Sequence, residues 1–441
     1  LDRSSAASDV YKRQVRTWAN SLALSLSLAL LSAVPARAEA DIVFGPSPRA
    51  LDNQTLFGAD TVPIWRNLHE AGVQEILLNG TFLMKSELRF GRNENGTYIS
   101  RPEETYLRQA DLDALARLQR DLGFSISYEA GAGLSGDACR QGFSPEERGR
   151  HAARQEFDQS LQRLSNAGIS ILALNVDGPF LRLIEGSTKQ AGCLKVKKSF
   201  DIDTTVRTVH SYLVEMRELV TKANNGTPPQ LRLVVNLPNW RLRGLPRRGG
   251  GTSVDLVDVL TAFSKLQTDS PDSVTISEIV IDYPYALVAE DPALFRDRSR
   301  HLWNATRTIN GSGAEGPQFG YITNSLSYVN ACLKREPRPD IAFLPYVRGG
   351  KPLSEACQRA QIGKGNLPDG RSDSDMDYLR DSLAYADQLS PGGALAAQLV
   401  VSDGTRIPSH IAHFYMQSWG MNPMRNIWFA DQLQCHLRDT C

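Results

Sequence analysis

The sequence predicts an α/β protein that folds as a single (β/α)8 barrel of the TIM type with long loops. Three observations support this prediction: short and nearly unbroken apolar runs, amphipathic stretches between them, and a length that suits one barrel. Such apolar runs are typical of strands buried on both faces of a parallel sheet. Strands that alternate with helices predict a chain of β/α units.

Eight apolar runs are the predicted strands: they span residues 41–46, 75–80, 124–129, 171–177, 231–238, 278–284, 319–324 and 396–404. Apolar residues at helical spacing predict the intervening helices: these span residues 61–71, 109–122, 152–167, 204–223, 254–266, 292–309 and 375–389. The last two strands have an alternative, because residues 341–347 (IAFLPYV) could replace either of them. Residues 334–370 are otherwise interpreted as an inserted loop.

A doubly wound open sheet is the competing fold. Its G-x-G-x-x-G fingerprint should follow the first strand and open a helix, and no such segment is found there. The pattern does occur at residues 131–136 and 311–316, where no helix is evident, so we interpret both segments as flexible loops. Since no internal repeat is visible, one catalytic-type domain is expected rather than the two or three that length alone suggests.

The first 40 residues are predicted to lie outside the barrel. Residues 21–34 form an apolar run that follows Arg16 and precedes Ala36-Arg37-Ala38, which is typical of a secretory signal peptide. The run is shorter than the roughly 20 residues of a membrane span, although an uncleaved anchor is an alternative. Residues 1–14 resemble translated sequencing-adapter sequence. We therefore predict non-native sequence over 1–14, a signal peptide over 15–40 and the barrel over 41–441.

Export of a bacterial protein to the periplasm or the medium agrees with the even number of cysteines. Proximity in the sequence suggests three disulfide bonds: Cys139–Cys193, Cys332–Cys357 and Cys435–Cys441. The 49 basic and 49 acidic residues give zero net charge, which argues against a dedicated nucleic-acid partner. The composition also excludes a disordered chain and a multi-pass membrane protein, and no membrane association is expected after signal cleavage. The sequence does not indicate an oligomeric state.

Polar residues at the ends of the predicted strands form the candidate site, because active sites of these barrels lie at the C-terminal ends of the strands. Amides and carboxylates bind hydroxyl groups, and aromatic rings stack on sugar rings, so this set favours a carbohydrate substrate. The candidate substrate-binding residues are Asn79, Tyr128, Asn175, Asn236, Asn239, Trp240, Tyr283, Tyr285, Asn324 and Asp403.

Two acids, Asp177 and Asp282, are the leading catalytic candidates, and Glu129 is a rival acid or base. Glycoside hydrolysis generally uses two carboxyl groups, one as acid and one as nucleophile or base. We expect Asp282 to protonate the leaving oxygen and Asp177 to act as nucleophile or base. The alternative is that one of the three acids caps a loop or pairs with an arginine.

Acids after the fourth and sixth strands are similar in placement to those of the alpha-galactosidase-like clan of (β/α)8 glycoside hydrolases. The resemblance implies a nucleophile at Asp177 and an acid/base at Asp282. It covers strand placement only, and Asn175 stands where that clan has a lysine two positions before the nucleophile. The sequence therefore resembles barrel glycoside hydrolases in general rather than one family.

Two further motifs bear on the substrate and on metals. Four arginines follow the fifth strand (Arg241, Arg243, Arg247 and Arg248), so they favour an acidic polysaccharide unless they form only a solvated surface loop. His410 and His413 have a spacing that could serve a metal, but H-E-x-x-H is absent, and neither a metal nor a cofactor is predicted.

Two other functions stay open at the level of the sequence. One is a non-catalytic glycan-binding barrel protein, in which the carboxylates only accept hydrogen bonds. The other is a metal-dependent phosphodiesterase or deacetylase that uses Asp177, Asp282 and a histidine. Release of reducing ends would distinguish the first alternative from a hydrolase, and sensitivity to chelators would support the second.

Overall fold

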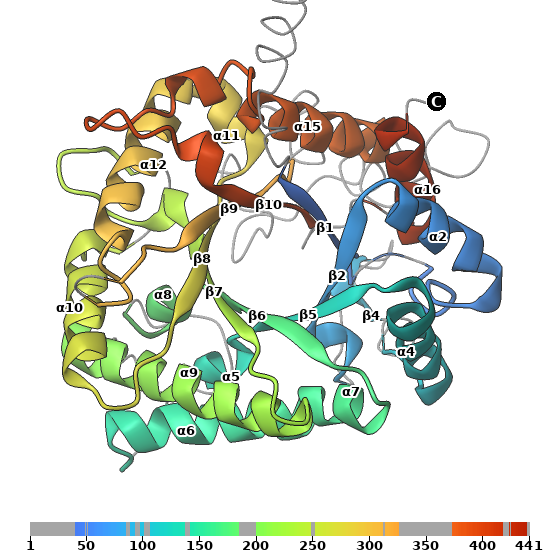
Figure 1. Ribbon diagram of the computed structural model, residues 1–441, viewed down its shortest axis with the longest axis horizontal. Helices are drawn as coiled ribbons and strands as arrows, with labels where there is room; N and C mark the ends of the chain where they lie inside the picture. Colours follow the sequence, from blue (N-terminus) through green and yellow to red (C-terminus); the bar gives the residue numbers. More distant parts are fainter. Residues whose placement is uncertain are drawn as a thin grey trace, which may run out of the picture. The chain divides into compact units, whose positions relative to one another are not determined.

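Eight parallel strands close into a barrel (Figure 1). Around the ring the strands are β1 (Asp41–Gly45), β2 (Val73–Asn79), β5 (Ser125–Ala130), β6 (Ile171–Asp177), β7 (Gln230–Asn236), β8 (Ile276–Asp282), β9 (Gln318–Ile322) and β10 (Ile411–Gln417). The first and last strands complete the ring, since β1 pairs in parallel with β10. The predicted (β/α)8 fold is therefore confirmed.

The computed structural model describes residues 40–48, 50, 52–84, 89–92, 98–100, 106–136, 142–184, 200–247, 252–311, 314–325, 373–417, 423 and 425–438. Residues from Ala40 onward form one compact unit. The alternative strand at 341–347 lies outside the described residues, as do all the cysteines except Cys435. Each predicted disulfide involves at least one such residue and stays a prediction. Among the described helices, none is long and apolar enough to cross a membrane.

Helices surround the barrel on the outside, and at least one follows each strand (Figure 1). The principal ones are α2 (Val62–Glu70), α4 (Gln109–Leu122), α6 (Pro145–Glu156), α7 (Gln162–Asn166), α9 (Ile202–Ala223), α10 (Leu256–Asp269), α12 (Pro292–Thr306), α15 (Asp373–Leu389) and α16 (Asn426–Leu437). A π-helical turn, Phe157–Leu161, joins α6 to α7. Short helices follow three of the strands directly: α5 (Ala132–Gly136), α8 (Pro179–Ile184) and α11 (Tyr285–Glu290).

The remaining elements are small. An antiparallel pair, β3 (Arg89–Arg92) and β4 (Tyr98–Ser100), lies between β2 and α4 in the sequence. Single 3-10 turns occupy Ala59–Thr61, Gly80–Phe82, Leu237–Asn239, Ala396–Gln398 and Ile407–His410.

Local sequence signals explain where the helices begin and end. Helix α9 begins after Asp201, whose carboxylate accepts the main-chain N–H of Thr204 at 2.7 Å. Helix α6 begins with a capping box, in which Ser144 and Glu147 satisfy each other's main-chain N–H groups. Helix α4 ends at Gly123, which has a φ of +82° and places the chain for β5. The predicted helix over 109–122 therefore matches α4, whereas α6 begins seven residues before the predicted start at 152 and α16 was not predicted.

Side chains inside the barrel form layers, because residues two apart on a strand point to the same side. A cluster of six apolar residues, the apolar ring, occupies the middle: Val43, Leu77, Val234, Val280, Ile322 and Tyr415. Residues two positions further along the chain face the C-terminal end of the barrel, which we call the mouth. Residues two positions earlier face the opposite end.

The layer opposite the mouth is a buried ion cluster. Arg232 donates two hydrogen bonds to the carboxylate of Glu75, at 2.6 and 3.1 Å, and its Nε lies 3.3 Å from Oε2 of Glu278. That same oxygen accepts the Tyr415 hydroxyl at 3.0 Å and lies 2.8 Å from Nδ1 of His413. The neighbouring carboxylates and Tyr415 raise the pKa of Arg232 in spite of its burial. This cluster joins β2, β7, β8 and β10 across the barrel.

The eighth strand is the main correction to the predicted fold. Residues 396–404 do not form a barrel strand, and β10 at Ile411–Gln417 takes that place. The chain reverses after Val401 because Asp403 accepts the main-chain N–H of Thr405 and Val401 bonds to the Thr405 carbonyl. Asp403 is therefore exposed on a turn before β10, away from the mouth. A smaller correction concerns residues 131–136, where the predicted loop contains the short helix α5.

Candidate active site

The mouth of the barrel holds a layer of amides and carboxylates. Two positions beyond the apolar ring lie Asn79, Asn236, Asp282, Asn324 and Gln417. Glu129 on β5 is in register with Asn79 on β2, so it joins the same layer. Asp177 completes the set at the end of β6. All three candidate catalytic acids therefore lie at the mouth.

Asp282 is held by two amides at the end of β8. Asn236 Nδ2 donates to its Oδ2 at 2.9 Å, and Asn324 Nδ2 donates to its Oδ1 at 3.2 Å. Burial, followed by the negative charge of Asp177, raises the pKa of Asp282 to about 7, although the two amides oppose this shift. A carboxyl group with a pKa near neutrality is suited to exchange a proton at neutral pH.

Asp177 is paired with Arg182 from the first turn of the following helix. Arg182 Nη2 donates to Asp177 Oδ2, and its Nε donates to the main-chain oxygen of the same residue at 2.7 Å. The turn between strand and helix is closed by Gly178, whose N–H donates to the Val234 carbonyl at 3.0 Å. The Asp177 side chain is 29% exposed, so this carboxylate is both oriented and reachable.

Glu129 is the most buried of the three acids, at 6% exposure. Its Oε2 accepts a hydrogen bond from Nε2 of Gln417 on β10. A side chain at Gly45 on β1 would place its Cβ 2.8 Å from that of Gln417, so the glycine leaves room for this amide. Burial and then the charge of Asp177 raise the pKa of Glu129 well above its ordinary value, while Arg182 and Gln417 oppose the shift.

A second buried carboxylate, Glu156 on α6, fixes the chain just beyond Glu129. It accepts the N–H of Gly133 at 2.7 Å, the N–H of Gly131 at 3.1 Å, and the hydroxyls of Tyr128 at 3.1 Å and Tyr212 at 2.9 Å. Gly131 has a φ of +107°, and a Cβ there would lie 3.1 Å from the Asp177 carbonyl oxygen. Burial raises the pKa of Glu156, an effect that these donors oppose. Glu156 therefore ties the turn after β5 to the outer helices.

Several predicted substrate-binding residues lie away from the mouth. Tyr128 points outward to Glu156, and Tyr283 packs edge-on against Phe295. Trp240 is 2% exposed and belongs to the core. The hydroxyl of Tyr285 accepts a hydrogen bond from Gln388 of α15, and its ring lies 5.4 Å from that of Tyr385. The buried Tyr128, Trp240 and Tyr283 pack between the barrel and its helices, which corrects their predicted place in the substrate site. Tyr285 is half-buried, and its main-chain N–H donates to the Asn324 carbonyl at 3.0 Å, so its role stays a prediction.

Asparagines at the strand ends take different positions. Asn236 and Asn324 bind Asp282, as described above. Asn175 is 1% exposed and lies in register with Glu129 on one side and with Arg232 of the ion cluster on the other. Asn79 accepts the N–H of Thr81 at 2.9 Å and so caps the turn after β2. Asn239 is half-buried in the turn Leu237–Asn239 beyond β7.

The arginine-rich segment after β7 is engaged in local contacts. Arg241 donates to the Ser253 carbonyl at 3.2 Å and Arg247 to the Thr252 carbonyl at 2.6 Å. Arg243 pairs with Asp258 at 3.4 Å, with both side chains well exposed. Arg248 lies outside the described residues. These contacts link the loop to the start of α10, so they weaken the case that the loop binds an acidic glycan.

The two histidines of the SHIAH motif are separated by the start of β10. His410 packs against Trp303 outside the barrel, whereas His413 contacts Glu278 in the ion cluster. Within the part of the chain that the structure describes, no three His, Cys, Asp or Glu side chains are grouped so that they could hold a metal ion.

Sequence reasoning missed three residues of the mouth and its support: Arg182, Gln417 and Glu156. Gln417 was missed because the eighth strand was misplaced. Arg182 and Glu156 lie on helices, where no strand-end rule applies. The signal for Arg182 was its place five residues after Asp177, close enough to turn back on the strand end.

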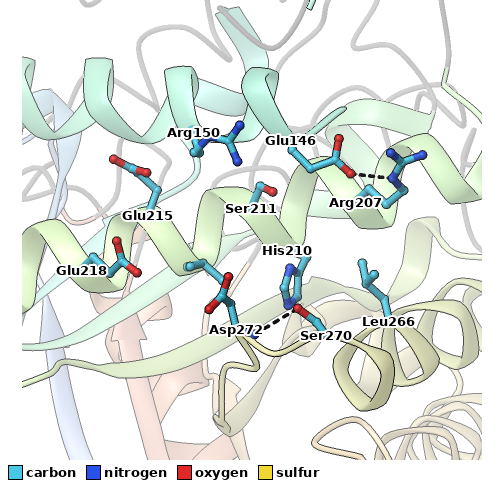
Figure 2. A pocket seen from close by; sticks show the side chains of 11 residues that line it. Glu146, Arg150, Arg207, His210, Ser211, Glu215, Glu218, Leu266, Ser270 and Asp272 are labelled. Atoms are coloured by element: carbon cyan, nitrogen blue, oxygen red, sulfur yellow. Dashed lines mark hydrogen bonds and ion pairs between the residues drawn. The ribbon is translucent and has the colours of Figure 1, made fainter. Parts of the chain in front are cut away.

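A hollow of about 330 Å³ lies on the outer side of the barrel, among α6, α9 and the end of α10 (Figure 2). Glu146 and Arg207 pair across it at 2.6 Å, and the N–H of Asp272 donates to the Ser270 hydroxyl. The hollow contains none of the predicted site residues. The candidate site therefore remains the mouth.

The fold and site define the class of protein as a (β/α)8 barrel with three carboxylates at its mouth. No family model matches the chain, and no curated protein matches it. Among solved structures, the chain is similar to a family 1 b-glucosidase from Thermotoga maritima, with 10% identity, 90% of this chain and 93% of that chain covered, and a TM-score of 0.35.

It is also similar to a GH18 chitinase from Pseudoalteromonas aurantia (11% identity, 64% and 80% covered, TM-score 0.31). An old yellow enzyme homologue from Zymomonas mobilis is similar at the same level (11% identity, 67% and 81% covered, TM-score 0.32). Proteins with different names are thus similar to this chain to the same degree, so the similarity does not distinguish among activities.

Proposed function

We propose that the protein is a glycoside hydrolase that cleaves an oligo- or polysaccharide by two-carboxylate catalysis. The observation that supports this proposal is the pairing of unlike acids at the mouth. Asp282 is an amide-held carboxyl group with a pKa of about 7, and Asp177 is an arginine-paired carboxylate. Glycosidases need one carboxyl group that can give a proton and a second that stays ionised.

In this proposal Asp282 protonates the glycosidic oxygen as the bond to the leaving sugar breaks. Asp177 acts on the anomeric carbon, either directly as nucleophile or through a water molecule as base. Arg182 orients Asp177, and the amides of Asn236 and Asn324 orient Asp282. Glu129 lies in the same layer and keeps its raised pKa next to Asp177, so it is the alternative proton donor.

The experiment is release of reducing ends from a panel of glycans by the purified protein. The variants Asp177→Asn and Asp282→Asn should each reduce the release at least about 1,000-fold while leaving the fold intact, since each removes an essential group. Glu218→Gln, an exposed acid on α9, is the matched control and should leave activity unchanged. Retained turnover in Asp282→Asn together with loss in Glu129→Gln would transfer the acid role to Glu129.

Binding of a glycan without any release of reducing ends would instead indicate a glycan-binding barrel. We also propose that the protein acts outside the cytoplasm, as a secreted or periplasmic enzyme. Cell fractionation of the expressed full-length chain tests this. Recovery of the intact chain in the cytoplasm, with no processing near Asp41, would contradict export.

A further inference from the structure

The hydrogen-bond donors around the carboxylates are already in use. Amide nitrogens of Asn236 and Asn324 donate to Asp282, and the amide of Gln417 donates to Glu129. Arg182 donates to Asp177. These donors therefore stabilise the acids of the protein itself and are not directed to a ligand.

One acceptor at the mouth has no partner. Among the described residues, Asn324 Oδ1 is buried there without a hydrogen bond. The orientation of Asn324 is fixed, because its Nδ2 must face the carboxylate of Asp282. A buried acceptor without a partner is unfavourable, and a ligand that brings donors relieves this cost.

The charges at the mouth also favour a ligand that carries a positive charge. Glu129, Asp177 and Asp282 lie close enough for Asp177 to act electrostatically on both other acids. Among the described residues, the guanidinium beside these acids is that of Arg182, and it is paired with Asp177. The arginines after β7 bond to nearby carbonyls or pair with Asp258. A cation reduces the repulsion among buried carboxylates, whereas an anion increases it.

We propose that the substrate is a glycan containing amino sugars with free, positively charged amines, whose ammonium group binds among Glu129, Asp177 and Asp282. An ammonium group supplies three donors and one positive charge, which suit the unpartnered Asn324 Oδ1 and the three acids among the described residues of the mouth. Neutral N-acetylated sugars supply fewer donors and no charge, and uronic acids bring a further negative charge. This inference rests on the proposed glycoside hydrolase function, since it concerns the same site.

The test compares ligands that differ only in the amine. Oligomers of glucosamine and of galactosamine are measured beside their fully N-acetylated forms and beside uronic-acid oligomers of equal length. Calorimetry with the wild-type protein, which keeps all three carboxylates, gives the affinities. Oligomers with sulfur in place of the glycosidic oxygen prevent turnover during the measurement. We expect the free-amine form of one of the two sugars to bind at least tenfold more tightly than its N-acetylated form. Binding of the uronic-acid oligomers should be weaker still.

Two variants connect the preference to the site. Glu129→Gln should reduce the preference for the free amine, because it removes one carboxylate from the mouth without changing its shape. Glu218→Gln is the control on the outer face of α9 and should leave the preference unchanged. An equal or tighter affinity for the N-acetylated or uronic-acid oligomers would overturn the inference.

Hydrolysis by the wild-type protein separates this inference from the proposed function. Release of reducing ends from neutral or acidic glycans, without preference for amines, overturns the inference and leaves the hydrolase proposal standing. Amine-dependent binding without release from any glycan supports the amine site and overturns the hydrolase proposal. Absence of both binding and release overturns both.

Discussion

Arg182 holds Asp177 at two points. Its Nε donates to the main-chain oxygen of Asp177 at 2.7 Å, and its Nη2 donates to the carboxylate. One guanidinium therefore fixes both the last residue of β6 and the direction of its side chain. The Arg182 side chain is 22% exposed and the Asp177 side chain is 29% exposed. The pair is therefore mostly enclosed by the protein, but a ligand can still reach the carboxylate.

Replacing Arg182 by Gln should lower kcat more than it raises KM, since the acid would be misplaced rather than lost. A displacement of about 1 Å costs on the order of 100-fold in rate. Arg182→Lys keeps the charge but cannot make both bonds from one planar group, so it should recover only part of the activity. Steady-state kinetics on the hydrolysed glycan measures this. An unchanged kcat in Arg182→Gln would show that Asp177 needs no such support.

The pH dependence of activity should report on Asp282. As general acid it must be protonated, and its pKa is about 7, so kcat/KM should be constant at mildly acidic pH and fall above about 7. Asn324→Ala removes an amide that favours the ionised form, so it should move this alkaline limit to higher pH. Rate profiles from pH 4 to 9 measure both effects. A decline that begins near pH 4 would contradict the raised pKa.

Breaking the buried ion cluster should destabilise the barrel strongly. Arg232→Met leaves Glu75 and Glu278 buried without their cation, which typically costs about 3–5 kcal/mol in the free energy of unfolding. The triple variant Glu75→Gln/Arg232→Met/Glu278→Gln should recover part of this loss, because no uncompensated charge remains. Denaturant titration measures the differences. Arg120→Met, which breaks an exposed pair with Asp121, is the control and should change stability by less than about 1 kcal/mol.

Glu156→Gln should lower the free energy of unfolding, although the substitution keeps the size of the side chain. The carboxylate accepts four groups, and an amide would turn an N–H toward at least one of them. Loss of hydrogen bonds to a charged group costs about 1.5–3 kcal/mol. Thermal and denaturant unfolding should show this decrease, while Glu218→Gln should stay within about 0.5 kcal/mol of wild type. Equal stabilities would mean that the donors find other partners.

Most of the barrel could be predicted from the sequence because its strands are nearly unbroken apolar runs. The eighth strand breaks that rule. β10 carries His413, Tyr415 and Gln417 on its inner side, so its polar residues alternate with apolar ones. The run at 399–401 has the expected composition but is followed by the Asp403 turn, and a composition rule cannot detect that reversal.

The site was predictable where strand ends determine it and unpredictable where helices contribute. Glu129, Asp177 and Asp282 meet because parallel strands end on the same side of the barrel. Alternation also explains the misplaced aromatics: Tyr128 adjoins the inward Glu129, and Tyr283 adjoins Asp282, so both point outward. Whether Arg182 faces Asp177 depends on how helix α8 is rotated after the turn at Gly178. The spacing of residues in the sequence does not specify that rotation.

The apolar ring separates two sets of ionisable groups along the barrel axis. The charges that shift the pKa values of Glu129 and Asp282 belong to the mouth, whereas the pKa of Arg232 is shifted by Tyr415 of the ring and by Glu75 and Glu278 of the opposite layer. The ring thus places apolar side chains between the acids of the mouth and the ion cluster that joins four strands of the barrel. We therefore expect that substitutions at the mouth, made in evolution or by engineering, can alter the substrate and still leave the ion cluster of the barrel unchanged.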